Sequence, residues 1–332
     1  MKLIERFDLL EKLRNYLVQD NPDLHETIEN AHYYNSWFTP EYIRLSINNI
    51  AQQFLNKGVL DAVAGQYGLR DSTPNPRRVG LVMAGNIPLV GFHDFLCIFL
   101  SGHYQSIKLS SKDSILMKHI VEILLRFQPA FQPYVQFAES LTGCDAYIAT
   151  GSNNTSRYFQ QYFAKYPHII RKNRTAIAIL DGMETAEELI ALSDDIQLYF
   201  GLGCRNVSQI WVPEGYDFLP LLNALGKYDH YLENHKYKHN YDYVLTINMM
   251  NREQYYTNGS IVLSPNRSPF AGIANVNYAY YPKIDQVINE LNPDDLQVIL
   301  GHDFKPFGQA QCPGFFDYAD GVDTMAFLMN IN

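Results

Sequence analysis

The feature of this sequence that most restricts its fold is a series of short apolar runs, each followed by a turn and a helical stretch. The runs are "VGLVMAG" from residue 79, "QSIKLSS", "DAYIATG", "RTAIAIL" and "SQIWVPE". We interpret each run as a buried strand, with helices at 113–127 and 184–195 among the connecting segments. Strands that alternate with helices predict an α/β fold with parallel sheets and right-handed crossovers.

Ligands of parallel sheets bind at the carboxyl ends of the strands. In this chain those ends hold three polar segments, namely Gly85–Asn86, Lys108–Ser111 and Thr150–Gly151–Ser152. Hydroxyls and lysines there suit a phosphorylated or ribose-bearing ligand, and they suit a solvated loop equally well. Backbone N–H groups of Gly151 and Ser152 would suit a pyrophosphate, although the sequence has no GxGxxG fingerprint.

Asn86 stands between a predicted strand and a proline-containing helix start. Local sequence favours an N-cap for the following helix. The alternative is a side-chain amide that donates to a developing oxyanion.

The composition indicates a globular protein that does not bind nucleic acid. The 332 residues suffice for two domains, and 47% are hydrophobic whereas 18% are charged. A net charge of −9 argues against a broad nucleic-acid surface, but allows a local basic pocket.

Neither the longest apolar stretch nor the N-terminal segment indicates a membrane protein. The longest apolar stretch is interrupted by Asn86, His93 and Asp94, so we interpret it as a buried strand and helix rather than a span. The opening residues carry charges among their apolar positions and predict an amphipathic helix instead of a signal peptide. We therefore expect a cytoplasmic protein.

The four cysteines show no CxxC spacing, and neither a zinc site nor a disulfide framework is expected. Cys97 lies in "FLCIFL" and is expected in the core. Cys204 follows two glycines in "FGLGCRNVSQ". A helix beginning at or beside Cys204 would favour its thiolate; the alternative is a packed cysteine at a turn. His302 and Asp303 have no visible partner, and no metal site is expected.

The order of the motifs is more specific than any one of them. "AGNIPL", "KLSSKDS", "TGS" and "GLGC" follow one another in an order that resembles the aldehyde dehydrogenase superfamily. The segments "SPNRSPFAGIANV" and "KPFGQAQCPGFFDYADGVDTMAFL" are more narrowly similar to the acyl-CoA reductases related to the fatty acid reductase of bacterial luminescence. The resemblance covers about residues 76 to 332.

This resemblance implies two Rossmann-like parallel-sheet domains behind an N-terminal helical segment at 1–75. Residues 76–171 would bind a nicotinamide cofactor, completed by a final strand within 306–332. Residues 172–305 would form the catalytic domain, with the active site in a cleft and a homodimer as the assembly.

The resemblance also assigns roles to single residues. Cys204 would be the nucleophile, and Asn86 would donate to the oxyanion together with the Cys204 N–H. Lys108 would contact the adenosine ribose, and Gly151 and Ser152 would lie near the pyrophosphate.

Two departures from the superfamily pattern narrow the expected reaction. Ile170 stands where aldehyde-oxidising members have a glutamate that activates water, and its loss favours reduction of a thioester. Ser111 followed by Lys112 replaces an acidic residue that would repel a 2′-phosphate. NADPH is therefore the expected cofactor, with NADH as the alternative.

The sequence thus predicts an NADPH-dependent acyl-CoA reductase that forms an acyl-cysteine on Cys204 and releases an aldehyde. One alternative is an acyl-phosphate reductase of the same mechanism. Phenylalanines 92, 95 and 99 hint at an apolar tunnel for an acyl chain, or belong to the core. The other alternative is a non-catalytic, dehydrogenase-like binding protein.

Overall fold

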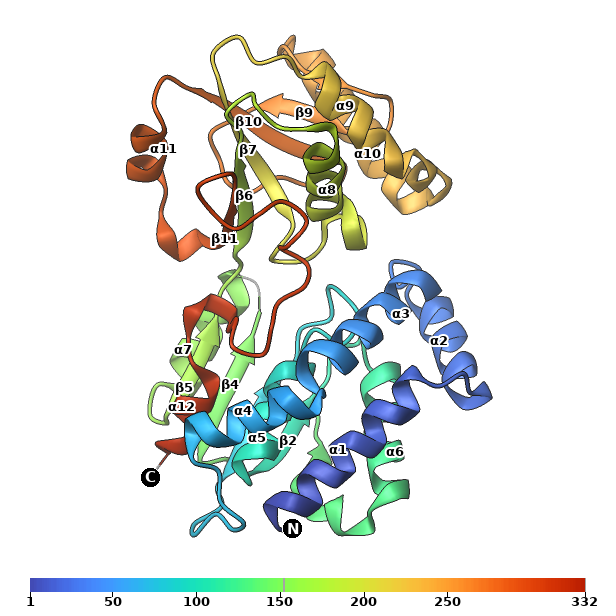
Figure 1. The fold of residues 1–332 in the computed structure, drawn as a ribbon, viewed down its shortest axis with the longest axis vertical. Coiled ribbons are helices and arrows are strands. Elements are labelled where there is room, and N and C mark those ends of the chain that lie inside the picture. Colours follow the sequence, from blue (N-terminus) through green and yellow to red (C-terminus); the bar gives the residue numbers. More distant parts are fainter. Residues whose placement is uncertain (152, 332) are drawn as a thin grey trace. The chain divides into compact units, whose positions relative to one another are not determined.

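The computed structural model describes residues 1–151 and 153–331. The chain divides into two compact units (Figure 1). Unit 1 comprises Met1–Asn173 and Gly314–Asn332, and unit 2 comprises Arg174–Pro313. Each unit is built on its own sheet, and the predicted α/β class with parallel sheets is confirmed.

Unit 1 contains a five-stranded, wholly parallel sheet. Its strands are β1 (Arg78–Val82), β2 (Tyr104–Lys108), β3 (Val135–Phe137), β4 (Ala146–Thr150) and β5 (His168–Arg171). The spatial order is β3-β2-β1-β4-β5, so the direction of chain progression reverses between β1 and β4. Register pairs Val82 with both Lys108 and Ala149, which brings the carboxyl ends of β1, β2 and β4 to one edge. In sheets of this kind such a reversal marks the ligand crevice.

The connections in unit 1 are helical. They include α5 (Phe92–Ser101), α6 (Ile115–Phe127) and α7 (Asn153–Phe163). Every apolar side chain of α5 is buried, as expected for a helix that is apolar all round. Cys97 is fully buried there, which confirms its place in the core. Phe92, Phe95 and Phe99 are each 0% exposed and pack in the core, so the tunnel suggested from them is wrong.

The N-terminal segment is helical as predicted. It forms α1 (Leu3–Val18), α2 (Pro22–Tyr34), α3 (Pro40–Asn49), a π-turn (Ile50–Phe54) and α4 (Lys57–Tyr67). Thr39 caps α3 through the N–H of Tyr42, with Pro40 at the first helical position. Leu10, Leu13 and Leu17 share one core with α5, so these helices are part of unit 1.

The C-terminal segment ends in a helix, and the expected final strand is wrong. Helix α12 spans Thr324–Met329, and Asp323 caps it through the N–H of Ala326. Met325 and Leu328, three positions apart, are both 0% exposed. Figure 1 shows α12 (red) beside α4 and α5, on which it packs.

Unit 2 contains a six-stranded sheet in the order β11-β6-β7-β10-β9-β8. Its strands are β6 (Thr175–Ile179), β7 (Val207–Pro213), β8 (Tyr256–Thr257), β9 (Val262–Pro265), β10 (Asn275–Tyr281) and β11 (Leu296–Leu300). Its helices are α8 (Ala186–Gln197), α9 (Leu219–Leu225), α10 (His235–Asn251) and α11 (Ile284–Glu290). Only β8 pairs antiparallel among these described strands.

Short 3-10 turns complete both units, at Pro129–Tyr134, Leu198–Gly201, Gly226–Glu233, Pro293–Asp295 and Ala319–Gly321. Within the described residues, no helix is both long and apolar enough to cross a membrane.

Candidate active site

Asn86 lies in the segment between β1 and α5, half-buried. Helix α5 begins only at Phe92, with Gly91 at its N-cap, so the interpretation of Asn86 as a helix cap is wrong. The segment after Asn86 is held from two sides. Asp113 Oδ2 accepts the Leu89 N–H at 2.7 Å, and Ser46 Oγ donates to the Pro88 carbonyl at 2.7 Å.

The lysine-led segment after β2 packs directly against the Asn86 segment. A Cβ on Gly85 would fall 2.6 Å from Ser110 Oγ, so only glycine permits this approach. Lys108, Ser111 and Lys112 are exposed at this edge of the sheet, where the sequence placed them. The two predicted segments of unit 1 thus form one continuous surface.

The backbone of Lys112 is fixed although its side chain is exposed. Its N–H donates to Ser110 Oγ at 3.2 Å, and its carbonyl accepts from Asn35 Nδ2 at 3.2 Å. Beside it lies a hollow of about 210 Å³. The lining residues are Ala31, Tyr34, Phe38, Ser111, Lys112, Asp113, Ser114 and Ile115.

Asp113 is a buried carboxyl beneath this surface. Burial raises its pKa to about 7, against the opposing effect of the Leu89 N–H. Sequence reasoning did not single out this residue, because a lone aspartate at the start of a helix resembles an ordinary capping residue.

Gly151 follows β4 at the same edge. Its N–H donates to the Arg171 carbonyl at 3.4 Å, which ties the turn to the end of β5. Ser152 lies outside the described residues. Ile170 packs with Cys144 and Tyr147 in a small apolar cluster, so no acidic group occupies this position.

Arg171 forms a buried ion pair that the sequence did not reveal. Its guanidinium pairs with Asp94 of α5 and donates to Thr324 Oγ1 of α12 at 2.8 Å. The only sequence signal was the single carboxylate inside an otherwise apolar helix.

Cys204 is the second residue of a tight turn. The turn Gly203–Asn206 is closed by the Asn206 N–H, which donates to the Gly203 carbonyl at 3.1 Å. Strand β7 starts directly afterwards, at Val207, and no helix begins at Cys204. Of the two interpretations of Cys204, the structure therefore has the turn, and the condition for stabilising its thiolate by a helix dipole is not met. The residue is half-buried.

The other three cysteines have raised thiol pKa values. Burial is the main cause for Cys97 and for Cys144, both of which are buried residues. Partial desolvation of its sulfur likewise raises the pKa of Cys312, although that residue is exposed overall. All three thiols are thus disfavoured as thiolates.

Tyrosines from the segment 228–281 pack against the residues that precede the cysteine turn. The ring of Phe200 lies 4.3 Å from that of Tyr231 and 6.0 Å from that of Tyr237. The Tyr231 hydroxyl also donates to the Gln197 carbonyl at 2.9 Å. Tyr231 and Tyr237 are thus buried packing residues of unit 2.

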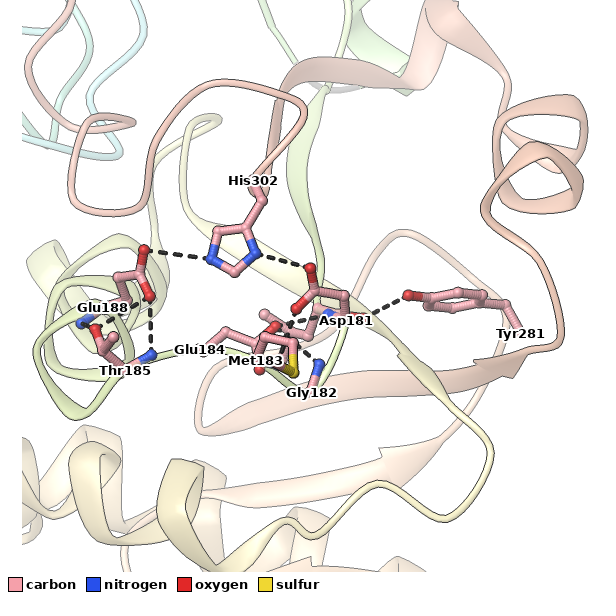
Figure 2. Close-up of polar contacts among 9 residues, drawn as sticks. Asp181, Gly182, Met183, Glu184, Thr185, Glu188, Tyr281 and His302 are labelled. Carbon is pink, nitrogen blue, oxygen red and sulfur yellow. Dashed lines mark hydrogen bonds and ion pairs between the residues drawn. The ribbon is translucent and has the colours of Figure 1, made fainter.

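A polar cluster occupies the opposite, carboxyl edge of the unit 2 sheet (Figure 2). His302, after β11, forms hydrogen bonds with Asp181 at 2.8 Å and with Glu188 at 3.3 Å. Its hydrogen bond to Asp181 is the main cause of a raised pKa. The sequence shows no partner for His302, and the folded unit supplies two. Among the described residues, no group of three or more His, Cys, Asp or Glu side chains could hold a metal ion.

No protein-family model matches the sequence, and no curated protein does either. Solved structures match the fold. An NADP-dependent enzyme from E. coli is 12% identical over 90% of this chain and 73% of its own, with a TM-score of 0.67. An aldehyde dehydrogenase from Bacillus cereus, in complex with NAD+, is 13% identical over 87% and 69%, with a TM-score of 0.61.

An NAD-dependent aldehyde dehydrogenase from Sinorhizobium meliloti is likewise 13% identical over 87% of this chain and 68% of its own, with a TM-score of 0.64. The chain therefore has the aldehyde dehydrogenase fold. Fold at such low identity does not determine the reaction.

Proposed function

We propose that this protein reduces an acyl-CoA thioester to an aldehyde through an acyl-cysteine on Cys204, with a nicotinamide cofactor. The observation that carries the proposal is the half-buried Cys204 at the centre of a fixed turn in an aldehyde dehydrogenase fold. It is supported by the burial of Cys97 and Cys144 in apolar cores, which keeps both thiols away from a substrate.

The groups at the crevice edge of unit 1 fit a nicotinamide dinucleotide. Lys108 would contact the adenosine ribose, and Ser111 with the cationic Lys112 would accommodate a 2′-phosphate on it. Gly151 would lie near the pyrophosphate. When bound there, the cofactor supplies a hydride to the acyl carbon.

In the proposed reaction, the Cys204 thiolate forms a bond to the thioester carbonyl carbon. The Cys204 N–H donates to the oxygen as it gains negative charge, and the resemblance to the superfamily assigns a second donor to the Asn86 amide. The C–S bond to coenzyme A then breaks, and the coenzyme leaves as a thiolate. After reduction, the C–S bond to Cys204 breaks, which releases the aldehyde and restores the enzyme.

The apolar packing of Ile170 supports reduction over oxidation. An enzyme that hydrolyses an acyl-cysteine needs a base that activates water. No such base stands at this position, so the acyl-cysteine persists until it is reduced.

We further propose that NADPH is preferred. Ser111, followed by Lys112, stands where other superfamily members have an acidic residue, and such a residue would repel the 2′-phosphate. Replacing Lys112 with Glu should raise KM for NADPH about tenfold more than KM for NADH, as expected when a cation–phosphate contact becomes a repulsion. The measurement is aldehyde formation from acyl-CoA with each cofactor. Equal effects on both cofactors would remove this part of the proposal.

The activity itself is tested with wild type and Cys204→Ala, measuring aldehyde and cofactor oxidation together. Equal amounts of both products from acyl-CoA, lost in Cys204→Ala, are the expected result. Turnover of an acyl phosphate but not of any thioester would instead identify an acyl-phosphate reductase. Turnover of neither would favour a binding protein.

A further inference from the structure

Asn206 closes the turn of Cys204 from both ends. The residue is 2% exposed and lies between the turn and β7. Its side-chain Oδ1 accepts the Gly203 N–H at 2.7 Å, and its own N–H donates to the Gly203 carbonyl at 3.1 Å. The two residues between them, Cys204 and Arg205, are therefore held by a reciprocal pair of hydrogen bonds.

The same side chain anchors the turn to α8. Asn206 Nδ2 lies 3.1 Å from the Asp195 carbonyl, 3.2 Å from that of Ile196 and 2.9 Å from that of Leu198. The last carbonyls of a helix have no partner within it, so one buried amide both satisfies them and fixes the turn.

A third attachment comes from the sheet. The Asn206 carbonyl accepts the Ala176 N–H at 3.1 Å, and Thr175 Oγ1 donates to it at the same distance. Asn206 is therefore bonded to a strand, to a helix end and to the cysteine turn.

The chain that connects α8 to this turn is strained. Tyr199 and Phe200 have backbone φ values of 56° and 58°, which L-residues other than glycine rarely adopt, and Gly201 follows with a φ of 73°. Such conformations persist only where the surroundings enforce them. Here the ring of Phe200 is buried against Tyr231. Asn206 Nδ2 donates to the carbonyl of Leu198, the residue directly before the strained segment.

We propose that Asn206 is the positioning residue of Cys204, holding its sulfur in the orientation required for attack. This inference rests on the proposed function, because a fixed orientation of the sulfur serves catalysis only if Cys204 attacks an acyl group. Asn206 acts through the turn and touches no reacting atom. A misplacement of about 1 Å can cost about 100-fold in rate, so its loss should slow acylation without weakening substrate binding.

The test compares Asn206→Ala with wild type and with Asn248→Ala. Asn248 is also buried in unit 2, on α10, and its Nδ2 donates to the Val244 carbonyl of its own helix. The first measurement is amide hydrogen exchange, which needs no substrate. The second is the rate at which Cys204 gains an acyl group from acyl-CoA, expressed per folded molecule.

In Asn206→Ala we expect amides of Gly203–Asn206 to exchange about tenfold faster, with little change elsewhere in unit 2. The maximal rate of acylation should fall by about 10- to 100-fold. The thioester concentration that gives half of that rate should stay unchanged within about twofold. Asn248→Ala should match wild type in both measurements. If Asn206→Ala does not fold, Asn206→Ser, an uncharged side chain that lacks the amide donors to α8, should show the same pattern.

Unchanged local exchange, or acylation at the wild-type rate per folded molecule, would overturn the role of Asn206. If wild type itself gains no acyl group from any thioester, the proposed function fails instead. The exchange measurement then decides alone whether Asn206 holds the turn.

Discussion

At the scale of single residues, unit 1 contains a buried ion pair between a guanidinium and a carboxylate. Arg171 and Asp94 are 4% and 5% exposed, and the guanidinium also donates to Thr324. Three distant parts of the sequence therefore meet at one buried guanidinium. A buried pair of this kind is strongly destabilising when only one partner is removed, because the other charge stays without compensation.

We expect Asp94→Leu to lower the free energy of unfolding by about 3–5 kcal/mol. The double variant Asp94→Leu with Arg171→Met should recover most of this loss, since apolar side chains then replace both charges. Urea unfolding of the three proteins measures the difference. A double variant no more stable than the single one would show that the ion pair itself contributes the stability.

Residue-scale prediction from sequence succeeded where chemistry is local and failed where a partner is distant. The exposed positions of Lys108, Ser111 and Lys112 follow from their place after a buried strand. The partners of Arg171 and His302 are 77 and 121 residues away in the chain, respectively. No periodicity or motif records such a contact, and only the folded sheet creates it.

At the scale of elements, the five strands β1, β2, β4, β6 and β7 were predictable, because apolar runs and helix periods alternate there regularly. Strands β3, β5 and β8–β11 were not singled out by the sequence. Of the two interpretations of the Cys204 segment, a helix start and a turn, the structure has the turn, because Asn206 satisfies both Gly203 and the end of α8. One element prediction failed for a physical reason. The final strand is a helix because Asp323 caps it and Met325 and Leu328 bury one face.

His302 links two elements and should make stability depend on pH. It joins the segment after β11 to Asp181 after β6 and to Glu188 of α8. Its pKa is raised in the folded protein, chiefly by the hydrogen bond to Asp181. This stabilisation is complete below the unfolded pKa of about 6.5 and is lost as pH rises through the folded value.

We therefore expect the free energy of unfolding of wild type, relative to His302→Gln, to fall as the pH rises above the unfolded pKa of about 6.5. Urea unfolding at several pH values measures this difference. Asp113 titrates near the same range, since its pKa is about 7, and the comparison with the variant removes its effect. Parallel curves for the two proteins would exclude His302 as the cause.

At the scale of the whole molecule, the chain forms two units, each with its own sheet and core. Trp37 belongs to unit 1 and Trp211 to unit 2, so each unit carries one of the two tryptophans. Arg171, Asp94 and Thr324 all lie in unit 1. The stability of each unit can thus be followed separately in the intact chain.

In protein labelled with fluorotryptophan, we expect Asp94→Leu to shift the unfolding of the Trp37 signal to lower urea. The Trp211 signal should move by less than half as much, roughly, because the lost ion pair lies in the other unit. Fluorine NMR across a urea series resolves the two signals without further substitutions. Equal shifts would show that the units unfold as one cooperative body.

The central claim is that Cys204 carries the acyl group, and intact-protein mass tests it most directly. Wild type, Cys204→Ala and Cys312→Ala are each mixed with a panel of acyl-CoA thioesters in the absence of reduced cofactor. We predict a mass gain equal to one acyl group in wild type and in Cys312→Ala, and none in Cys204→Ala. An adduct that persists in Cys204→Ala, or no adduct with any thioester, would contradict the account.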